Sequence, residues 1–288
     1  MKITLIGLGK MGSVLAQRLL TANFDLTVFN RTTEKMKPLI DAGAKGAATI
    51  EDAVKEAEIV ISCLLDDKAV LDSVAHFAPL LKPNTIHLGT STIIPETSKK
   101  LTELHQRHGS IYVAGNVLGV PKVAARGELT SIVAGPADAI EQCRPILDAY
   151  SIKVVPVGPH PFQANAMKIC MNYMLVSAIE TMGELYAFAE KSQLDTSIVN
   201  TMFHSIYAHP AFKLYVDKIH TRDFDDVNFD MKGGLKDLSL FQQAFANVGV
   251  VPDVANIIKD KFIIALAHHM DEKDWSGIAE ITRLQANI

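Results

Sequence analysis

The chain has 288 residues, with 28 basic and 32 acidic side chains and a formal net charge of −4. This length suggests two domains, and 48% hydrophobic with 21% charged residues is ordinary for a folded globular protein, which excludes disordered and low-complexity classes. The balanced charge gives no electrostatic basis for binding nucleic acid. No apolar run approaches the ~18 residues that a membrane span requires, and no cleavable leader is evident. We therefore expect a soluble, cytoplasmic protein that binds neither nucleic acid nor membranes.

The three cysteines, Cys63, Cys143 and Cys170, are far apart and lie in apolar surroundings. No pair of cysteines or histidines has the spacing of a zinc site. The sequence therefore predicts neither a disulfide framework nor a bound metal.

The first half of the chain alternates short apolar runs with helical patterns. The strand candidates are residues 3–6, 25–29, 59–63, 85–88, 111–114, 131–134 and 154–157, and the clearest helical patterns cover 11–22, 33–42, 95–108 and 137–150. Nearly continuous apolar strands that alternate with helices are typical of parallel sheets buried on both faces. The pattern predicts a mostly parallel, doubly wound α/β domain over residues 1–160.

The character of the sequence changes after Gly158-Pro159-His160-Pro161. Every later segment with a clear period has a helical one: residues 162–191, 196–206, 235–246, 252–268 and 277–285. We find no strand pattern and no internal repeat in this half. The sequence predicts an all-α domain over residues 161–288.

A glycine-rich segment, Gly7-Leu8-Gly9-Lys10-Met11-Gly12, follows the first strand and opens the first helix. In this context the first glycine permits a tight turn, the second lets a pyrophosphate approach the backbone, and the third allows close packing of helix and strand. The helix N-terminus supplies N–H groups for the anion. A glycine-rich turn without a ligand is the alternative, but the position favours a dinucleotide and a Rossmann fold.

The end of the second strand bears on the choice of cofactor. An NAD site places a carboxylate there to bind the ribose hydroxyls, whereas this chain has Asn30-Arg31-Thr32. No carboxylate repels a 2′-phosphate, and Arg31 can pair with one through charged hydrogen bonds. The alternative is an ordinary surface arginine near a helix start. The segment favours NADP over NAD.

A polar stripe crosses the apolar helix predicted for residues 162–191. Asn165, Lys168 and Asn172 stand at i, i+3 and i+7 and therefore share one face. An unpaired ammonium is costly in a core, so a buried stripe needs partners. The alternative is a lysine that extends from an exposed face into water.

At this point the sequence resembles the β-hydroxyacid dehydrogenases, a family that includes 3-hydroxyisobutyrate dehydrogenases, tartronate semialdehyde reductases and glyoxylate/succinic semialdehyde reductases, with imine reductases as relatives. Five motifs carry the resemblance, in order along almost the whole chain: Gly7–Gly12, Asn30–Thr32, Ser91-Thr92-Ile93-Ile94-Pro95, Lys168-Ile169-Cys170-Met171-Asn172 and Lys236-Asp237.

The resemblance implies an NADP-dependent enzyme without a metal, in which Lys168 is the general acid and Asn172 fixes the substrate or the lysine. The implied cofactor-binding residues are Gly7, Leu8, Gly9, Met11, Gly12, Asn30, Arg31, Thr32, Leu64, Thr92 and Lys236. Two of these roles have alternatives that involve no ligand. Ser91 or Thr92 would serve equally as the N-cap of the helix that starts at Pro95, and Lys236 with Lys232 would fit a solvated helix face.

One segment departs from the family. Members typically carry a Ser-Gly-Gly loop that binds the substrate carboxylate, and here Leu118 stands in place of that serine, followed by Gly119. A leucine side chain donates no hydrogen bond, so the segment predicts a drier substrate site formed by Leu118, Gly119 and Lys168. A small hydroxycarboxylate is thereby less suited as substrate.

We therefore expect a reductase that transfers hydride from NADPH to a small aldehyde or ketoacid, with its active site between the two domains. An enzyme that reduces C=N bonds is the alternative within the enzyme class, and a non-catalytic NADP-binding sensor is the alternative outside it. The predicted helix over residues 162–191 also carries more apolar surface than a small helical domain can cover. This surplus predicts a homodimer joined through the helical domain.

Overall fold

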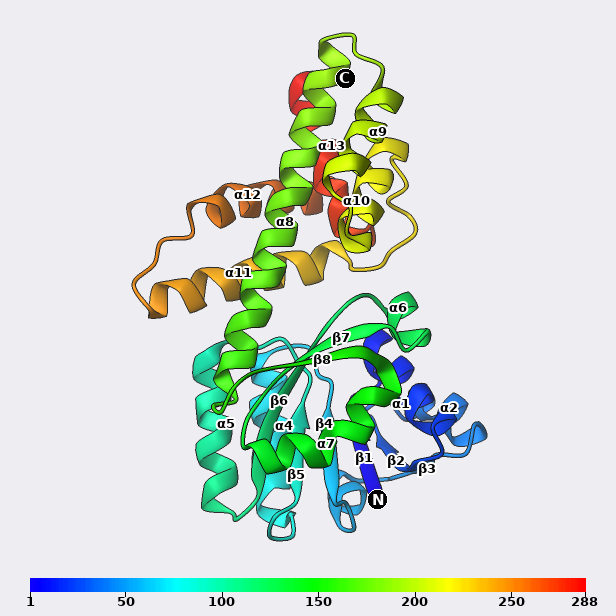
Figure 1. Ribbon diagram of the computed structural model, residues 1–288, viewed down its shortest axis with the longest axis vertical. Coiled ribbons are helices and arrows are strands. Elements are labelled where there is room, and N and C mark those ends of the chain that lie inside the picture. Colours follow the sequence, from blue (N-terminus) through cyan, green and yellow to red (C-terminus); the bar gives the residue numbers. More distant parts are fainter. The chain divides into compact units, whose positions relative to one another are not determined.

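An eight-stranded sheet organises the first part of the computed structural model, which describes all 288 residues. Its strand order is β3-β2-β1-β4-β5-β6-β7-β8 (Figure 1). The strands are β1 Lys2–Ile6, β2 Asp25–Phe29, β3 Lys45–Gly46, β4 Ile59–Ser62, β5 Ile86–Gly89, β6 Ile111–Leu118, β7 Leu129–Ala134 and β8 Ser151–Gly158. All neighbouring strands are parallel except β6 and β7. The predicted mostly parallel, doubly wound sheet is confirmed.

Helices cover both faces of this sheet. They are α1 Lys10–Thr21, α2 Lys37–Asp41, α3 Ile50–Val54, α4 Asp67–Phe77, α5 Pro95–Arg107, α6 Pro121–Ala125 and α7 Ala137–Tyr150, with short 3₁₀ turns at Thr33–Met36 and Ala78–Leu80. On one face of the sheet, α1 packs with α6 and α7. On the other face, α4 packs with α3 and α5. Ile59 and Ile61 of β4 belong to the hydrophobic core that includes Leu15 of α1. Val60, between them, is also buried but does not belong to that core. Alternate side chains of one strand thus serve two cores, which explains its continuous apolar sequence.

Strand β6 is longer than the sequence suggested. We predicted a strand over residues 111–114 and a loop from Gly115, but β6 continues to Leu118 because β7 pairs with it antiparallel from Ala114↔Ala134 to Leu118↔Thr130. This pairing satisfies the backbone groups that a loop would leave to water. Leu118 therefore lies at the end of a strand and not within a loop, and Gly119 follows it with φ +131°.

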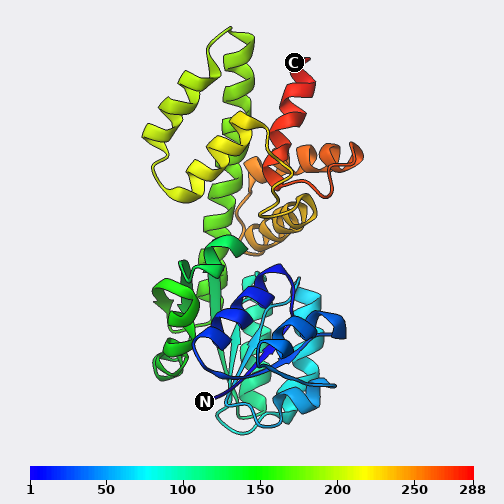
Figure 2. The same ribbon diagram turned by 90° about the vertical axis from the view of Figure 1, so that its right-hand side faces the viewer.

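The remaining chain is helical. It contains α8 Phe162–Lys191, α9 Thr196–Ile206, α10 Pro210–Thr221, α11 Met231–Asn247, α12 Asp253–Ala267, a 3₁₀ turn at Trp275–Gly277 and α13 Ile278–Ala286 (Figure 2). By its contacts the chain divides into two units, Met1–Ile169 and Cys170–Ile288, so the first turns of α8 belong to the sheet unit. Helix α10 was not predicted. Its first residue is Pro210, which ends a helical pattern in sequence but is favourable at this position because the missing N–H has no partner there.

The core of the second unit forms around one face of α8. Val176, Ile179 and Met182 are fully buried, as are Phe241 of α11 and Phe262 of α12. Gly183 allows α8 and α13 to approach closely, since a Cβ atom there would lie 2.9 Å from the Cβ of Ala279 in α13. No helix of the structure is long and apolar enough to cross a membrane.

Candidate active site

The turn between β1 and α1 has the backbone that a dinucleotide requires. Gly7 has φ +99°, and a Cβ there would lie 2.4 Å from the carbonyl oxygen of Cys63. A Cβ on Gly12 would lie 2.0 Å from the carbonyl oxygen of Gly7, so the third glycine permits the close approach expected of it. Beside Gly9 nothing lies within 4 Å of an added Cβ, which leaves open space for a phosphate. The first turn of α1 contains no acidic residue, so its N–H groups and dipole favour an anion.

The segment after β2 touches this turn. Asn30 accepts a hydrogen bond through Oδ1 from the Leu8 N–H at 2.9 Å, and its Nδ2 donates to the Thr32 carbonyl at 2.9 Å. Arg31 is exposed. Thr32 precedes the 3₁₀ turn without a side-chain capping bond. The structure therefore brings the glycine turn and Asn30–Thr32 together, as a bound adenosine phosphate would require.

The loops that follow β4 and β5 are held to each other. The Leu64 N–H donates to Ser91 Oγ at 2.8 Å, and Thr90 Oγ1 donates to the Ser62 carbonyl at 2.8 Å. The predicted alternative, that Ser91 or Thr92 caps α5, is wrong, because Ile94 is the N-cap and its N–H donates to Asp67 Oδ1 at 3.0 Å. Ser91 instead fixes the loop that carries Thr92, which is half-buried.

Asn116 on β6 completes this arrangement, and no motif in the sequence indicated its role. Its side chain is fully buried, and Nδ2 donates to the Ser91 carbonyl at 2.9 Å. Three segments at the carboxyl edge of the sheet are thus joined by hydrogen bonds, and ligands of open α/β sheets bind at this edge.

Lys168 is half-buried on α8, and its Nζ donates to the Val117 carbonyl of β6 at 2.8 Å. The alternative of a lysine extended into water is therefore wrong. The contact is to the residue that precedes Leu118. Asn165, one turn earlier on α8, is 1% exposed, which shows that this part of the polar stripe is buried.

Asn172 lies one turn after Lys168 and bonds within the second unit. Its Nδ2 donates to Asp237 Oδ2 at 2.9 Å, and Lys236 Nζ lies 2.7 Å from Asp237 Oδ1. Asp237 is 2% exposed, so it is the buried carboxylate that links the two predicted residues. The sequence predicted no role for Asp237 itself, although the Lys236-Asp237 motif contains it. Lys236 does not belong to a solvated face; Lys232 does, paired with Asp271 at the surface.

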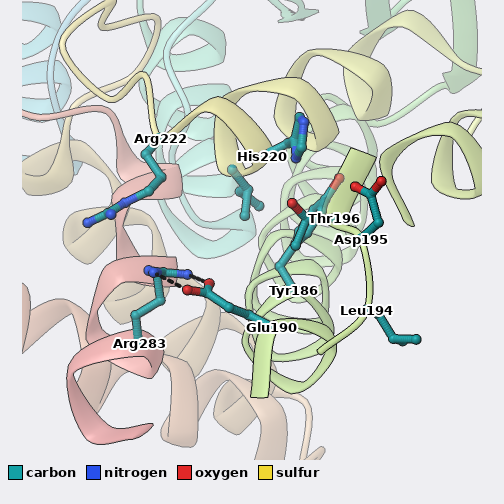
Figure 3. Close-up of a pocket in the computed structure, with 9 residues that line it drawn as sticks. Tyr186, Glu190, Leu194, Asp195, Thr196, His220, Arg222 and Arg283 are labelled. Carbon is teal, nitrogen blue, oxygen red and sulfur yellow. Dashed lines mark hydrogen bonds and ion pairs between the residues drawn. The ribbon is translucent and has the colours of Figure 1, made fainter. Parts of the chain in front are cut away.

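A cavity of about 480 Å³ in the second unit contains none of the predicted residues (Figure 3). Tyr186 lines it and follows Asn172 by some four turns of α8, about 21 Å along the helix. Figure 3 shows its Arg283 and Glu190 side chains joined as an ion pair, and Arg222 is paired with Glu280. Asp195, the remaining charged lining residue, accepts from the Ser197 N–H at 2.9 Å, so the charged groups of this cavity already have partners and we assign no ligand to it. Nowhere does the structure gather three His, Cys, Asp or Glu side chains that could hold a metal ion.

Two family models match the chain. The model for the NAD-binding domain of 6-phosphogluconate dehydrogenase matches residues 2–158, and the model for the NAD-binding region of NADP-dependent 3-hydroxyisobutyrate dehydrogenase matches residues 163–282. The first match lies within the sheet unit, and the second begins with α8, whose first turns belong to the sheet unit, and continues through the helical unit.

Individual relatives agree with these models. The uncharacterized oxidoreductase YfjR of Bacillus subtilis is 35% identical over 96% of this chain and 98% of its own length. The 3-hydroxyisobutyrate dehydrogenase of Pseudomonas aeruginosa is 31% identical over 74% of this chain and 72% of its own.

Solved structures show the same fold. A Mycobacterium tuberculosis 3-hydroxyisobutyrate dehydrogenase with L-serine superposes with a TM-score of 0.87 at 24% identity, over 98% of this chain and 99% of that one. A Streptomyces aurantiacus imine reductase has a TM-score of 0.66 at 22% identity over 98% and 99%. The two family models together match most of the chain, and the relatives agree with them. The glycine turn, Lys168 and Asn172 stand in the motifs of the same family. The chain therefore belongs to the β-hydroxyacid dehydrogenase family of NAD(P)-dependent oxidoreductases.

Proposed function

We propose that this protein is an NADPH-dependent reductase of small aldehydes or ketoacids, with Lys168 as the general acid. The observation that carries the proposal is the contact between Lys168 Nζ and the Val117 carbonyl. This contact holds the ammonium group of Lys168 beside the end of β6. When bound, NADPH supplies the hydride. Lys168 then donates a proton to the oxygen on which negative charge develops.

Within the helical unit, Asn172 would bind the substrate and Lys236 the cofactor, the roles that the family resemblance implies. Asp237 accepts from Asn172 Nδ2, so the Oδ1 atom of that amide faces away from the carboxylate and is available to a hydroxyl or to the lysine. Asp237 also orients Lys236 through their ion pair. We assign residues 1–160 to the cofactor and residues 161–288 to the substrate and to dimerisation.

NADPH preference follows from Asn30–Thr32. The segment has no carboxylate, and the exposed Arg31 is available to a 2′-phosphate beside the glycine turn. Arg31 would pair with that phosphate through charge-assisted hydrogen bonds, which NADH cannot accept.

Reduction of C=N bonds is a second candidate, and Leu118 is the observation that favours it. An apolar side chain beside Lys168 offers no donor to a carboxylate, which suits a substrate without one. A retained lysine argues for the carbonyl reaction, because an ammonium group repels a cationic imine.

The deciding experiment is a panel of aldehydes, ketoacids and cyclic imines, assayed by the loss of NADPH absorbance and repeated with NADH. Turnover of aldehydes or ketoacids at a higher kcat/KM than imines supports the proposal. Turnover of imines alone supports the second candidate. Tight NADPH binding without turnover of any member would leave a non-catalytic NADP-binding sensor as the better description.

We also propose a homodimer joined through α8. Met167, Met174, Leu185 and Phe188 fall on one stripe of this helix and are 40%, 46%, 42% and 66% exposed. An exposed apolar stripe of this length is typical of a subunit interface.

A further inference from the structure

The side chain of Asn30 joins two segments that would hold different parts of one cofactor. Its Oδ1 accepts from the Leu8 N–H inside the glycine turn, and its Nδ2 donates to the Thr32 carbonyl across Arg31, both at 2.9 Å. One partner is a donor and the other an acceptor, so the orientation of the amide is determined by its contacts. Aspartate, serine or alanine at this position would not make both bonds.

The bond to Leu8 satisfies a backbone group that has no other partner. Leu8 is 2% exposed, and the preceding N–H of Gly7 is already bonded to the Phe29 carbonyl at 3.0 Å. A backbone N–H in such a place is costly without an acceptor. Asn30 therefore determines the course of the turn at the point where a phosphate would approach Gly9.

The bond to Thr32 acts on the other segment. It closes a small ring around Arg31, which fixes the backbone at that residue and leaves its guanidinium exposed. An arginine on a fixed backbone loses less conformational freedom when it pairs with a phosphate. The same amide thus determines the backbone conformation of the glycine turn and that of Arg31, from which the guanidinium extends.

We infer that Asn30 is a positioning residue that couples the phosphate-binding turn to Arg31 and sets NADPH affinity through Leu8 and Thr32, not by contact with the ribose. This inference rests on the proposed function in one respect, the pairing of Arg31 with the 2′-phosphate. The bond from Leu8 to Asn30 is a property of the cofactor-free protein and is measurable there, whereas the coupling to Arg31 is measured through cofactor affinity.

The first measurement is amide hydrogen exchange of Leu8 in the cofactor-free protein, by NMR. We expect Asn30→Ala to raise the Leu8 exchange rate about tenfold, the effect of losing one hydrogen bond. Asn30→Asp keeps the Oδ acceptor and should leave Leu8 protected. Thr33→Ala is the matched control, because Thr33 is exposed and lies just outside the Asn30–Thr32 segment. A direct ribose contact would not change exchange in the absence of cofactor.

The second measurement is cofactor affinity, from fluorescence titrations with NADPH and NADH. Asn30→Ala should weaken NADPH about tenfold or more and NADH by a smaller factor, since NADH depends on the turn alone. In an Arg31→Ala background the effect of Asn30→Ala on NADPH should fall to its effect on NADH, which is the signature of coupling.

The outcomes separate the two claims. Unchanged Leu8 exchange in Asn30→Ala overturns the positioning role, whatever the cofactor preference. An undiminished effect on NADPH in the Arg31→Ala background overturns the coupling. If Arg31→Ala weakens NADPH and NADH equally, the proposed NADPH preference fails while the exchange result still decides the role of Asn30 in the turn.

Discussion

Lys168 and Val117 are 51 positions apart in sequence, and the lysine Nζ donates a 2.8 Å hydrogen bond to the valine carbonyl. The contact joins the first turns of α8 to the end of β6. This end of β6 extends beyond its pairing with β5 and is paired with β7 alone. It also holds the ammonium group in place before any substrate arrives. Such preorganisation lowers the cost of aligning a proton donor with a carbonyl oxygen.

Replacement of this lysine tests the mechanism. Lys168→Ala should lower kcat by a factor on the order of 10²–10⁴, the usual contribution of a positioned acid. The Kd for NADPH should change little, because the glycine turn and Asn30–Thr32 lie elsewhere on the sheet edge. Lys168→Arg should not restore activity, since guanidinium keeps its proton at any working pH. Steady-state kinetics and a fluorescence titration measure both effects.

Lys232→Ala is the matched control, because Lys232 pairs with Asp271 at the surface of the helical part. It should retain full activity. If Lys168→Arg recovers most of the activity and the loss in Lys168→Ala appears in KM, the lysine orients substrate and does not donate the proton.

The residue next to this contact tests the substrate class. Leu118→Ser restores the donor that the family typically has there, so we expect kcat/KM for small carboxylate-bearing aldehydes to rise by about tenfold, the value of one charge-assisted hydrogen bond. Ile152→Ser, which removes an apolar side chain 75% exposed on β8, serves as the control. No gain in a folded Leu118→Ser variant that binds NADPH would mean that this position does not face the substrate.

Elements with a strong local pattern were predictable from the sequence. Helices α7, α8 and α9 begin and end at the predicted residues, because their apolar periods run without interruption between clear turn signals. The extension of β6 was not predictable, because its partner β7 is set by pairing across the sheet and not by local sequence. Helix α10 was missed because a proline at its first position suggests a break.

The candidate site shows the same division. The sequence predicted which residues carry the chemistry through their motifs, but not their partners. Asp237 is 65 positions from Asn172, and Asn116 is 25 from Ser91. Neither contact has a local period or spacing, so only the folded chain brings these side chains together.

Arg31 tests cofactor choice. Loss of a charge-assisted contact to a phosphate is worth on the order of 1.5–3 kcal/mol, so Arg31→Ala should weaken NADPH by roughly tenfold to a hundredfold and NADH little. Arg144→Ala, which removes an exposed arginine paired with Asp148 in the same unit, should affect neither cofactor. Equal losses for the two cofactors would show that Arg31 does not read the 2′-phosphate.

The exposed stripe of α8 tests assembly. Light scattering at micromolar concentration should give the mass of a dimer, and Phe188→Glu should shift it toward the monomer because Phe188 is 66% exposed in the single chain. Ile40→Glu, at an exposed apolar residue of the sheet unit, should leave the mass unchanged. A monomeric wild-type protein would contradict the proposal.

A buried pair of histidines makes the stability of the sheet unit dependent on pH. His87 of β5 bonds to Ser62 Oγ at 2.8 Å and to His105 of α5 at 2.9 Å, and His105 continues to Ser110 Oγ at 2.8 Å. Both imidazoles are fully buried. The rings of Phe77 and Tyr112 pack around them, and the exposed His108 follows the last residue of α5.

Burial lowers the pKa of both histidines. The pKa of His87 falls well below 6.5 through burial and then through the charge of His105, and burial with a smaller effect of His108 lowers the pKa of His105 to about 4. The unfolded chain therefore binds protons near pH 6.5 that the folded protein does not bind. This contribution to stability is complete above pH 6.5 and is lost progressively as the pH falls toward about 4.

We expect the free energy of unfolding to decrease by up to about 2.7 kcal/mol per pH unit from two such sites within that window. Urea denaturation at several pH values measures it. His105→Gln removes one titrating group and should flatten the pH dependence relative to wild type, even where its absolute stability is lower. His108→Gln, an exposed neighbour, should keep the wild-type slope. Equal slopes in wild type and His105→Gln would mean that the pair does not take up protons on unfolding and that carboxylates alone set the acid limit.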